Sequence, residues 1–259
     1  SLLTILGEDG EFEDFIKQNL TETVSTNFVY KIGSPTIVKK RFVEHINKSK
    51  ILGVYSMNDE LFHGDNEAQF RQFLEELIPK HDLVIVSDYG HGMITKDTAK
   101  YIAGKAPFVT LNAQVNAANI GYHTMDKYES VNCIIINETE LRHELRDKQG
   151  ALEPLIREIS EKLKTAYTVV TQGNTGATLY NRQKDKIYYC PAFASKVVDK
   201  IGAGDAMLAL FSVALFKTGK ENIPLFLGSL AASQSVETVG NSVPVSKTLL
   251  LKTIQHAFK

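Results

Sequence analysis

Three things are scarce in this sequence: long apolar runs, cysteine, and a surplus of one charge. No stretch approaches the roughly 20 apolar residues that a membrane-spanning helix needs, so we expect no membrane partner. Cys133 and Cys190 are too few for a disulfide scaffold. Each lies in an apolar, strand-like run, so we expect buried free thiols and a cytoplasmic location. With 29 basic and 30 acidic residues, the chain has no overall electrostatic surface for nucleic acid.

The rest of the composition is that of an ordinary globular protein. Hydrophobic residues make up 43% of the 259 residues and charged residues 23%, which excludes wholesale disorder and fits one large α/β domain over 1–259. The chain starts at Ser1 rather than at Met and runs directly into the strand-like segment 2–6. We therefore expect that sequence upstream has been removed and that the chain is a piece of a longer protein.

From residue 66 onward, short apolar runs alternate with amphipathic stretches. The runs predict strands at 83–87, 108–111, 133–136 and 167–171 and a hairpin at 177–180 and 186–189. The amphipathic or apolar stretches predict helices at 66–79, 96–105, 138–146, 153–163, 203–216, 223–239 and 246–258. This alternation is typical of a mostly parallel central sheet sandwiched by helices, in which ligands bind at the carboxyl ends of the strands.

The part of the chain before residue 66 follows a different pattern. Segment 11–20 has helical spacing, and three strand-like runs then follow with no helix between them: 27–32, 36–44 and 50–56. We expect these runs to form a small antiparallel sheet apart from the main one. Lys39 and Arg41 alternate with apolar neighbours on the second run, so both point to one face, which either contacts an anionic group or is solvated.

The most informative segment is Asp199-Lys200-Ile201-Gly202-Ala203-Gly204-Asp205, which runs into an apolar helix. Gly202, Ala203 and Gly204 can turn several backbone N–H groups toward one point, where the helix dipole adds positive charge and favours an anion. A carboxylate in the same turn, Asp205, suits the deprotonation of a hydroxyl beside a bound phosphoryl group. The plain alternative is a glycine-rich turn with an acidic residue in the first helical turn.

This segment resembles the signature of the ribokinase family, the phosphofructokinase-B-type sugar kinases. Three further landmarks occur in the family's order: 137–140 resembles its Asn-x-x-Glu motif, 171–176 its Thr-x-Gly-x-x-Gly turn, and 231–241 the helix and loop beside the adenine. The resemblance covers nearly the whole chain. It implies a ribokinase-like fold with a small β lid at 27–56, ATP and Mg²⁺ with a possible monovalent cation as cofactors, a sugar as partner, and a homodimer formed through the lid.

The resemblance also implies a role for each residue of the site. Asp205 would be the general base, beside the anion site of Gly202, Ala203 and Gly204. The implied nucleotide ligands are Asn137, Glu140, Thr171, Gly173, Gly176, Ser233 and Asn241, and the implied metal ligands are Glu140 and Asp199. Asn137 also suits a helix N-cap with Glu140 as its capping-box partner, and both roles are compatible.

Within this family, three segments resemble the heptose 7-phosphate kinases: 87–92 (Ser-Asp-Tyr-Gly-His-Gly), 38–43 and 236–241. The implied acceptor ligands are Asp88, Lys39, Arg41 and Asn112. Asp88 lies at the end of a buried strand, where it also suits a turn start.

The sequence departs from the family pattern in three places. Asn112-Ala113-Gln114 replaces the Asp-Pro-Lys of heptose kinases. This change removes charge, so the resemblance does not determine which sugar is the acceptor. Lys200-Ile201 replaces a threonine-containing pair. The family's amino-terminal strand and sugar-binding Gly-Gly segment are absent, so we expect part of the sugar pocket to come from elsewhere.

These observations favour an ATP-dependent kinase that phosphorylates a sugar hydroxyl, with a heptose phosphate as the first acceptor to consider. A nucleoside or another small alcohol is the alternative acceptor. A different class of function also fits: a nucleotide-binding, non-catalytic or regulatory module of a larger polypeptide. The missing amino-terminal segment and the altered 112–114 triplet favour that module, whereas the intact turn at 202–205 opposes it.

Overall fold

The computed structural model describes residues 1–45, 50–114, 119, 123–240 and 242–257. Its main sheet has six strands in the order β10-β9-β8-β7-β6-β5. These strands are β5 (Val84–Asp88), β6 (Val109–Ala113), β7 (Cys133–Asn137), β8 (Tyr167–Thr171), β9 (Ala177–Asn181) and β10 (Lys186–Cys190). β5 to β8 run parallel, and β9 and β10 form an antiparallel hairpin at one edge. The predicted mostly parallel sheet is confirmed.

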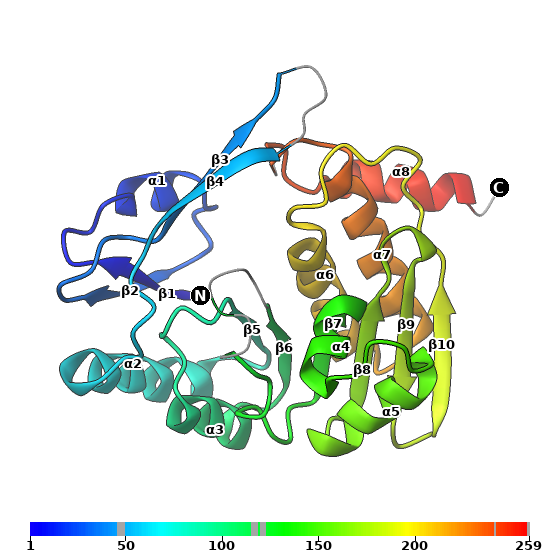
Figure 1. Ribbon diagram of the computed structural model, residues 1–259, viewed down its shortest axis with the longest axis horizontal. Helices are drawn as coiled ribbons and strands as arrows, with labels where there is room; N and C mark the ends of the chain where they lie inside the picture. The colour runs from blue at the N-terminus through cyan, green and yellow to red at the C-terminus, as the bar shows by residue number, and fades with distance from the viewer. Residues whose placement is uncertain (46–49, 115–118, 120–122, 241, 258–259) are drawn as a thin grey trace.

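Helices cover both faces of this sheet (Figure 1). One face carries α2 (Gly64–Leu77), the 3-10 turn η1 (Ile78–Lys80), α3 (Lys96–Lys105), α4 (Glu138–Leu145) and α5 (Leu152–Lys162). The other carries α6 (Ala203–Thr218) and α7 (Asn222–Val236), and α8 (Lys247–Ala257) follows. Among the described residues, none of the helices combines the length and the apolar character that crossing a membrane requires.

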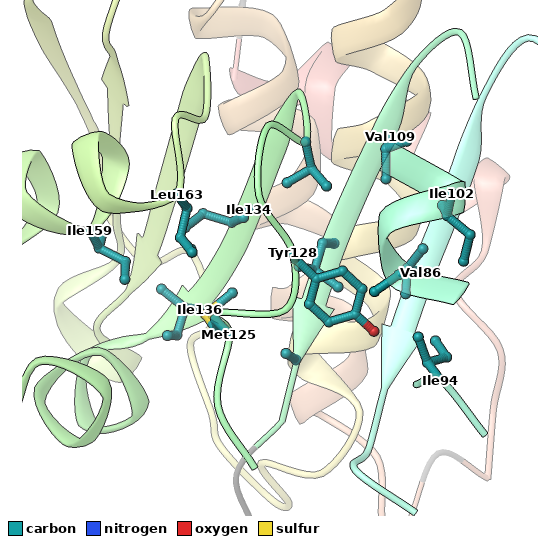
Figure 2. Close-up of a cluster of buried hydrophobic side chains, with 14 of the residues drawn as sticks. Val86, Ile94, Ile102, Val109, Met125, Tyr128, Ile134, Ile136, Ile159 and Leu163 are labelled. Carbon is teal, nitrogen blue, oxygen red and sulfur yellow. The ribbon is translucent and has the colours of Figure 1, made fainter. Parts of the chain in front are cut away.

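The apolar core lies in two layers, one on each face of the sheet, and β7 contributes to both. Ile134 and Ile136 belong to the layer under α2 to α5, which Figure 2 shows together with Tyr128. Cys133 and Ile135, the alternate residues, belong to the layer under α6 and α7. Successive side chains of a strand point to opposite faces, so a strand buried on both faces must be apolar throughout. Both cysteines are free and buried, as expected.

The amino-terminal part forms two separate pairs of strands. β1 (Leu2–Gly7) and β2 (Thr26–Lys31) pair in parallel, and the chain between them contains α1 (Glu13–Gln18). β3 (Val38–Val43) and β4 (Lys50–Ser56) form an antiparallel ribbon that projects from the body (Figure 1). The expectation that 27–32 joins the other two runs in one antiparallel sheet is therefore wrong, because β1 takes up β2 as its partner.

Thr36 explains why the ribbon begins where it does. Its side-chain oxygen accepts a 2.9 Å hydrogen bond from the backbone N–H of Gly7 and donates one of 2.9 Å to the backbone oxygen of Glu11. These bonds tie the segment after β2 to the end of β1. The chain is therefore free to form the ribbon only after this point, and β3 starts at Val38 rather than at 36.

Candidate active site

A large cavity of about 1770 Å³ opens at the carboxyl ends of β5, β6, β7 and β8. It exceeds the roughly 300–1,000 Å³ of an ordinary small-molecule pocket, so it has room for a nucleotide and an acceptor together. Most of the residues that the sequence predicts for the site line it: Lys39, Arg41, Asp88, Asn112, Asn137, Glu140, Thr171, Gly173, Gly176, Gly202, Ala203, Gly204, Asp205 and Ser233. The remaining two are Asp199, which is not part of this lining, and Asn241, which lies outside the described residues.

The first turn of α6 faces this cavity. Gly202 precedes the helix with φ of 84°, a left-handed conformation that L residues with a side chain rarely adopt, and no side chain caps the helix. The N–H groups of the first turn have no partner within a helix, and here the residues that carry them, Ala203, Gly204 and Asp205, line the cavity. With the helix dipole, this geometry favours an anion.

The carboxylate of Asp205 extends from this turn toward the ends of β5 and β6. Its Oδ1 accepts a 2.9 Å hydrogen bond from the hydroxyl of Tyr89 and one of 3.2 Å from the side-chain amide of Gln114. The hydroxyl of Ser87 lies 3.5 Å from the same oxygen. Burial, with the negative charge of Asp205 second, raises the pKa of Tyr89 to about 12, so this hydroxyl keeps its proton and acts as a donor. Asp205 thus connects the first turn of α6 to the ends of β5 and β6.

The β3–β4 ribbon supplies two basic side chains to the cavity. Lys39 and Arg41 both line the cavity, as their alternation on β3 predicts. The Lys39 ammonium lies 5.2 Å from the ring centroid of Tyr89 and 5.9 Å from that of Tyr55 on β4. Burial lowers the pKa of Lys39. These contacts place Lys39 against the residue that holds Asp205.

Asp88 is occupied by contacts within the protein. Its Oδ2 lies 2.7 Å from the ammonium of Lys127 and 2.6 Å from the hydroxyl of Tyr128, and its Oδ1 accepts a 2.9 Å bond from the N–H of Gly90. Burial alone would raise the pKa of Asp88, but the charge of Lys127, followed by that of His123, outweighs it and the net pKa is lowered. The geometry therefore gives Asp88 an organising role in the loop after β5, and a direct contact with the acceptor remains a prediction.

Two more polar side chains line the cavity. Asn112 is buried, and its amide donates a 2.7 Å hydrogen bond to the backbone oxygen of Ile135. Its Oδ1 has no hydrogen-bond partner among the described residues. His91 has Nδ1 2.8 Å from a carboxylate oxygen of Asp59. Burial, then the charge of Lys39, lowers the pKa of His91, so the ring is neutral at neutral pH.

Asn137 and Glu140 form the expected capping box at the start of α4. The side chain of Asn137 accepts a 2.8 Å bond from the N–H of Glu140, and a carboxylate oxygen of Glu140 accepts one of 3.0 Å from the N–H of Asn137. Both residues still line the cavity. The capping role is confirmed, and it fixes Glu140 at the cavity wall.

The opposite end of the cavity is formed by the turn after β8 and by α7. Thr171 ends β8, and the 3-10 turn η2 (Gly173–Thr175) follows it. Apolar side chains from the segment before α6 and from α7 line the wall beside Ser233: Phe193, Val197, Ala232 and Val236. A polar turn next to an apolar wall suits phosphates on one side and a flat base on the other.

The carboxylates do not form an all-protein metal cage. Among the described residues, no group of three or more His, Cys, Asp or Glu side chains could hold a metal. Asp199 accepts hydrogen bonds from the N–H groups of Ile201 at 3.1 Å and Gly240 at 2.9 Å, so it fastens the turn before α6 to the loop after α7. Glu140 lines the cavity beside Asn137, and a carboxylate there fits Mg²⁺ of the kind held mainly by substrate phosphates and water.

The sequence alone did not identify Tyr89 and Gln114 as partners of Asp205. They lie 116 and 91 residues from it along the chain. Both lie just after parallel strands, in segments that the resemblance had already marked. Position at the carboxyl edge of the sheet was the signal that could have selected them.

Known proteins resemble this chain in sequence and in fold. Bifunctional protein HldE of Campylobacter jejuni (strain RM1221) is 26% identical over 94% of this chain and 50% of its own length. The protein of the same name from Koribacter versatilis is 26% identical over 97% of this chain and 51% of its own. The chain thus spans about half the length of the curated relatives it matches.

Solved structures share the fold at lower identity. Ribokinase from Thermotoga maritima superposes with a TM-score of 0.72 at 20% identity, covering 96% of this chain and 80% of that one. Phosphofructokinase-2 from Escherichia coli, solved in complex with potassium, has a TM-score of 0.75 at 15% identity, covering 99% and 82%. The ribokinase-like fold is confirmed. The profile of the pfkB family carbohydrate kinases matches residues 1–248, and the chain therefore belongs to that family.

Proposed function

We propose that this chain is an ATP-dependent carbohydrate kinase domain that transfers the γ-phosphoryl group to a hydroxyl of a sugar. One observation carries the proposal: the Asp205 carboxylate and the uncapped start of α6 face the same cavity, which is large enough for both substrates. Positioning, charge neutralisation and removal of one proton are what phosphoryl transfer requires. Family membership supports the same reaction.

The proposed reaction forms one bond, breaks one bond and transfers one proton. The acceptor oxygen forms a bond to the γ-phosphorus, the bond from that phosphorus to the bridging oxygen of ADP breaks, and the hydroxyl proton passes to Asp205. The first turn of α6 would bind the transferred group. Mg²⁺ supplies neutralisation of the phosphate charge when bound, and Glu140 is the residue that would hold it. A monovalent cation beside the turn fastened by Asp199 stays a prediction.

We propose a phosphorylated sugar, with heptose phosphate first, as the acceptor. Lys39 and Arg41 line the acceptor side, where two basic side chains suit a phosphate. A nucleoside or another uncharged alcohol would leave these two charges unused. The non-catalytic module has one observation in its favour, because Gln114 already donates to Asp205. Since that bond uses Oδ1, the other oxygen is left for the acceptor, and catalysis remains the better fit.

The outer face of the ribbon supports the proposed homodimer. Phe42, Leu52 and Val54 are 53%, 53% and 48% exposed. The β3–β4 register places Phe42 opposite Leu52, with Val54 two positions along, on the face away from Lys39. A second copy of the chain would cover this apolar face. Phe42→Glu should lower the sedimentation-derived mass from dimer to monomer. An unchanged mass would count against this interface.

The function is tested by ADP release from the chain with ATP, Mg²⁺ and pairs of free and phosphorylated sugars: ribose and ribose 5-phosphate, glucose and glucose 6-phosphate, sedoheptulose and sedoheptulose 7-phosphate. We expect acceptor-dependent release, fastest with a phosphorylated sugar. Binding of ATP should also stabilise the fold by about 2.7 kcal/mol at a hundredfold excess over Kd. Stabilisation by ATP without release for any sugar would favour the non-catalytic module. If ATP does not stabilise the fold and no sugar leads to ADP release, the proposed nucleotide site is contradicted.

A further inference from the structure

Tyr89 lies between the ribbon and the base and touches both. Its hydroxyl donates the 2.9 Å hydrogen bond to Oδ1 of Asp205, and the ammonium of Lys39 lies 5.2 Å from the centroid of its ring. A cation over the face of an aromatic ring is attracted to it, and the attraction grows when the pair is shielded from water. A continuous chain of contacts thus runs from the ribbon through one side chain to the carboxylate.

Contacts other than Asp205 and Lys39 fix the backbone on both sides of Tyr89. Asp88, the residue before it, is held by Lys127 and Tyr128 and accepts the N–H of Gly90. The amide of Asn119 donates a 2.9 Å bond to the backbone oxygen of Tyr89 itself. Tyr89 therefore stands on an anchored loop, and its hydroxyl is a fixed point toward which Asp205 is drawn.

Asp205 is held through one carboxylate oxygen. It lies in the first turn of α6, which no side chain caps, and its carboxylate is held at Oδ1 by Tyr89 and Gln114. A carboxylate held through one oxygen presents the other in a defined direction. Proton transfer depends on that direction, since a general base must lie within hydrogen-bond reach of the hydroxyl it deprotonates.

We propose that Tyr89 is a positioning residue that couples the ribbon to the base. Its hydroxyl orients Asp205, and its ring contacts Lys39, the residue that would bind the acceptor's phosphate. This inference rests on the proposed function. It adds that binding energy from the phosphate, a part of the substrate that does not react, is used to align the reacting group, and such coupling raises kcat rather than affinity alone.

The charged groups facing this arrangement come from two elements. Lys39 and Arg41 approach from β3, and Asp205 approaches from α6; both Asp205 and Arg41 influence the pKa of Tyr89. Because burial and the charge of Asp205 raise the pKa of Tyr89, its hydroxyl stays protonated and donates to the carboxylate.

The kinetic test uses Tyr89→Phe, which keeps the ring and removes the hydroxyl, and Tyr89→Leu, which removes both. For Tyr89→Phe we expect kcat to fall about tenfold, since a hydrogen bond to a charged group is lost, while the KM for ATP is unchanged. Tyr55→Phe is the matched control, because it removes a hydroxyl from the other ring near Lys39. We expect that control to keep the parental kcat.

The coupling has its own signature. In the parent, kcat for a phosphorylated sugar should exceed kcat for the free sugar, and Tyr89→Leu should erase that difference. If the parent turns over but Tyr89→Phe keeps the parental kcat for phosphorylated sugars, Tyr89 is a structural residue and the inference is wrong while the kinase function stands.

A measurement that needs no turnover separates the inference from the function. The carbon-13 resonance of the Tyr89 phenol carbon should shift in Asp205→Asn. It should also respond to sedoheptulose 7-phosphate in the parent, but not in Lys39→Ala, whereas the resonance of Tyr189 should stay still in every case. A Tyr89 signal that ignores Asp205→Asn, or that answers the sugar phosphate equally without Lys39, would overturn the coupling even if the chain proves inactive.

Discussion

The side of the cavity that we propose for the phosphates of ATP is bounded by two backbone turns, and the proposed acceptor side by side chains. The first turn of α6 and the turn after β8 present N–H groups whose directions follow from the fold. On the acceptor side, Lys39, Tyr89 and Gln114 come from a ribbon and two strand ends and act through their side-chain atoms. We therefore expect the nucleotide half to tolerate substitution and the acceptor half to decide specificity.

Asp205 belongs to both halves, so its substitution should have the largest effect. Asp205→Asn keeps the size and hydrogen-bonding capacity of the side chain but removes the proton acceptor, and turnover should fall about 10²- to 10⁴-fold. ATP affinity, measured by calorimetry, should stay the same or rise, because a negative charge beside the phosphates is lost. Turnover within a few-fold of the parent would place the base elsewhere.

The loop that carries Tyr89 depends on a buried ion pair. Lys127→Met leaves Asp88 buried without its cation, and the free energy of unfolding should drop by about 3–5 kcal/mol. Lys164→Met, which breaks the exposed pair with Glu129, is the control and should change stability little. If both variants lose the same free energy of unfolding in urea, Asp88 does not organise the loop.

The basic face of the ribbon should affect the acceptor alone. Lys39→Ala with Arg41→Ala should raise the KM for a phosphorylated sugar, since each charge-assisted contact is worth about 1.5–3 kcal/mol, and should leave the KM for ATP nearly unchanged. Lys40→Ala on the opposite face of β3 is the matched control. If the double variant and the control handle every acceptor alike, the ribbon is only a solvated strand face.

Substitution of the two glycines at the start of α6 should affect different properties, stability at Gly202 and ATP binding at Gly204. Gly202 has φ of 84°, so Gly202→Ala should cost about 1–3 kcal/mol of stability through backbone strain. Gly204 has open space around the position of an added Cβ, so Gly204→Ala should fold normally. Because Gly204 lines the cavity, Gly204→Val should weaken ATP binding without lowering the melting temperature. Unimpaired binding in Gly204→Val would show that phosphates do not approach this turn.

The sequence was sufficient for features that depend on local pattern. The spacing of Asn137 and Glu140 predicts the capping box that the structure contains. The glycine-rich turn before α6 was visible for the same reason. The apolar run at 83–87 correctly predicts a strand, but its expected burial on both faces is wrong, because β5 is an edge strand and Ile85 is exposed.

Features that depend on contacts between distant segments were not predictable in this way. Nothing local says that β2 pairs with β1 rather than with β3. The carboxylate of Asp88 suggested a substrate ligand, but Lys127 and Tyr128, some 40 residues later, already bind it. Tyr89 and Gln114 likewise reach Asp205 only after the sheet has assembled.

If one cavity brings the γ-phosphate of ATP and a sugar hydroxyl together at Asp205, label should pass from ATP to the sugar. The decisive experiment incubates the chain with γ-³²P-labelled ATP, Mg²⁺ and sedoheptulose 7-phosphate and then separates the sugars. We expect label in a bisphosphorylated sugar, with Asp205→Asn as the blank. Label that remains in ATP or appears only as inorganic phosphate, with that sugar and with the other phosphorylated sugars, would contradict it.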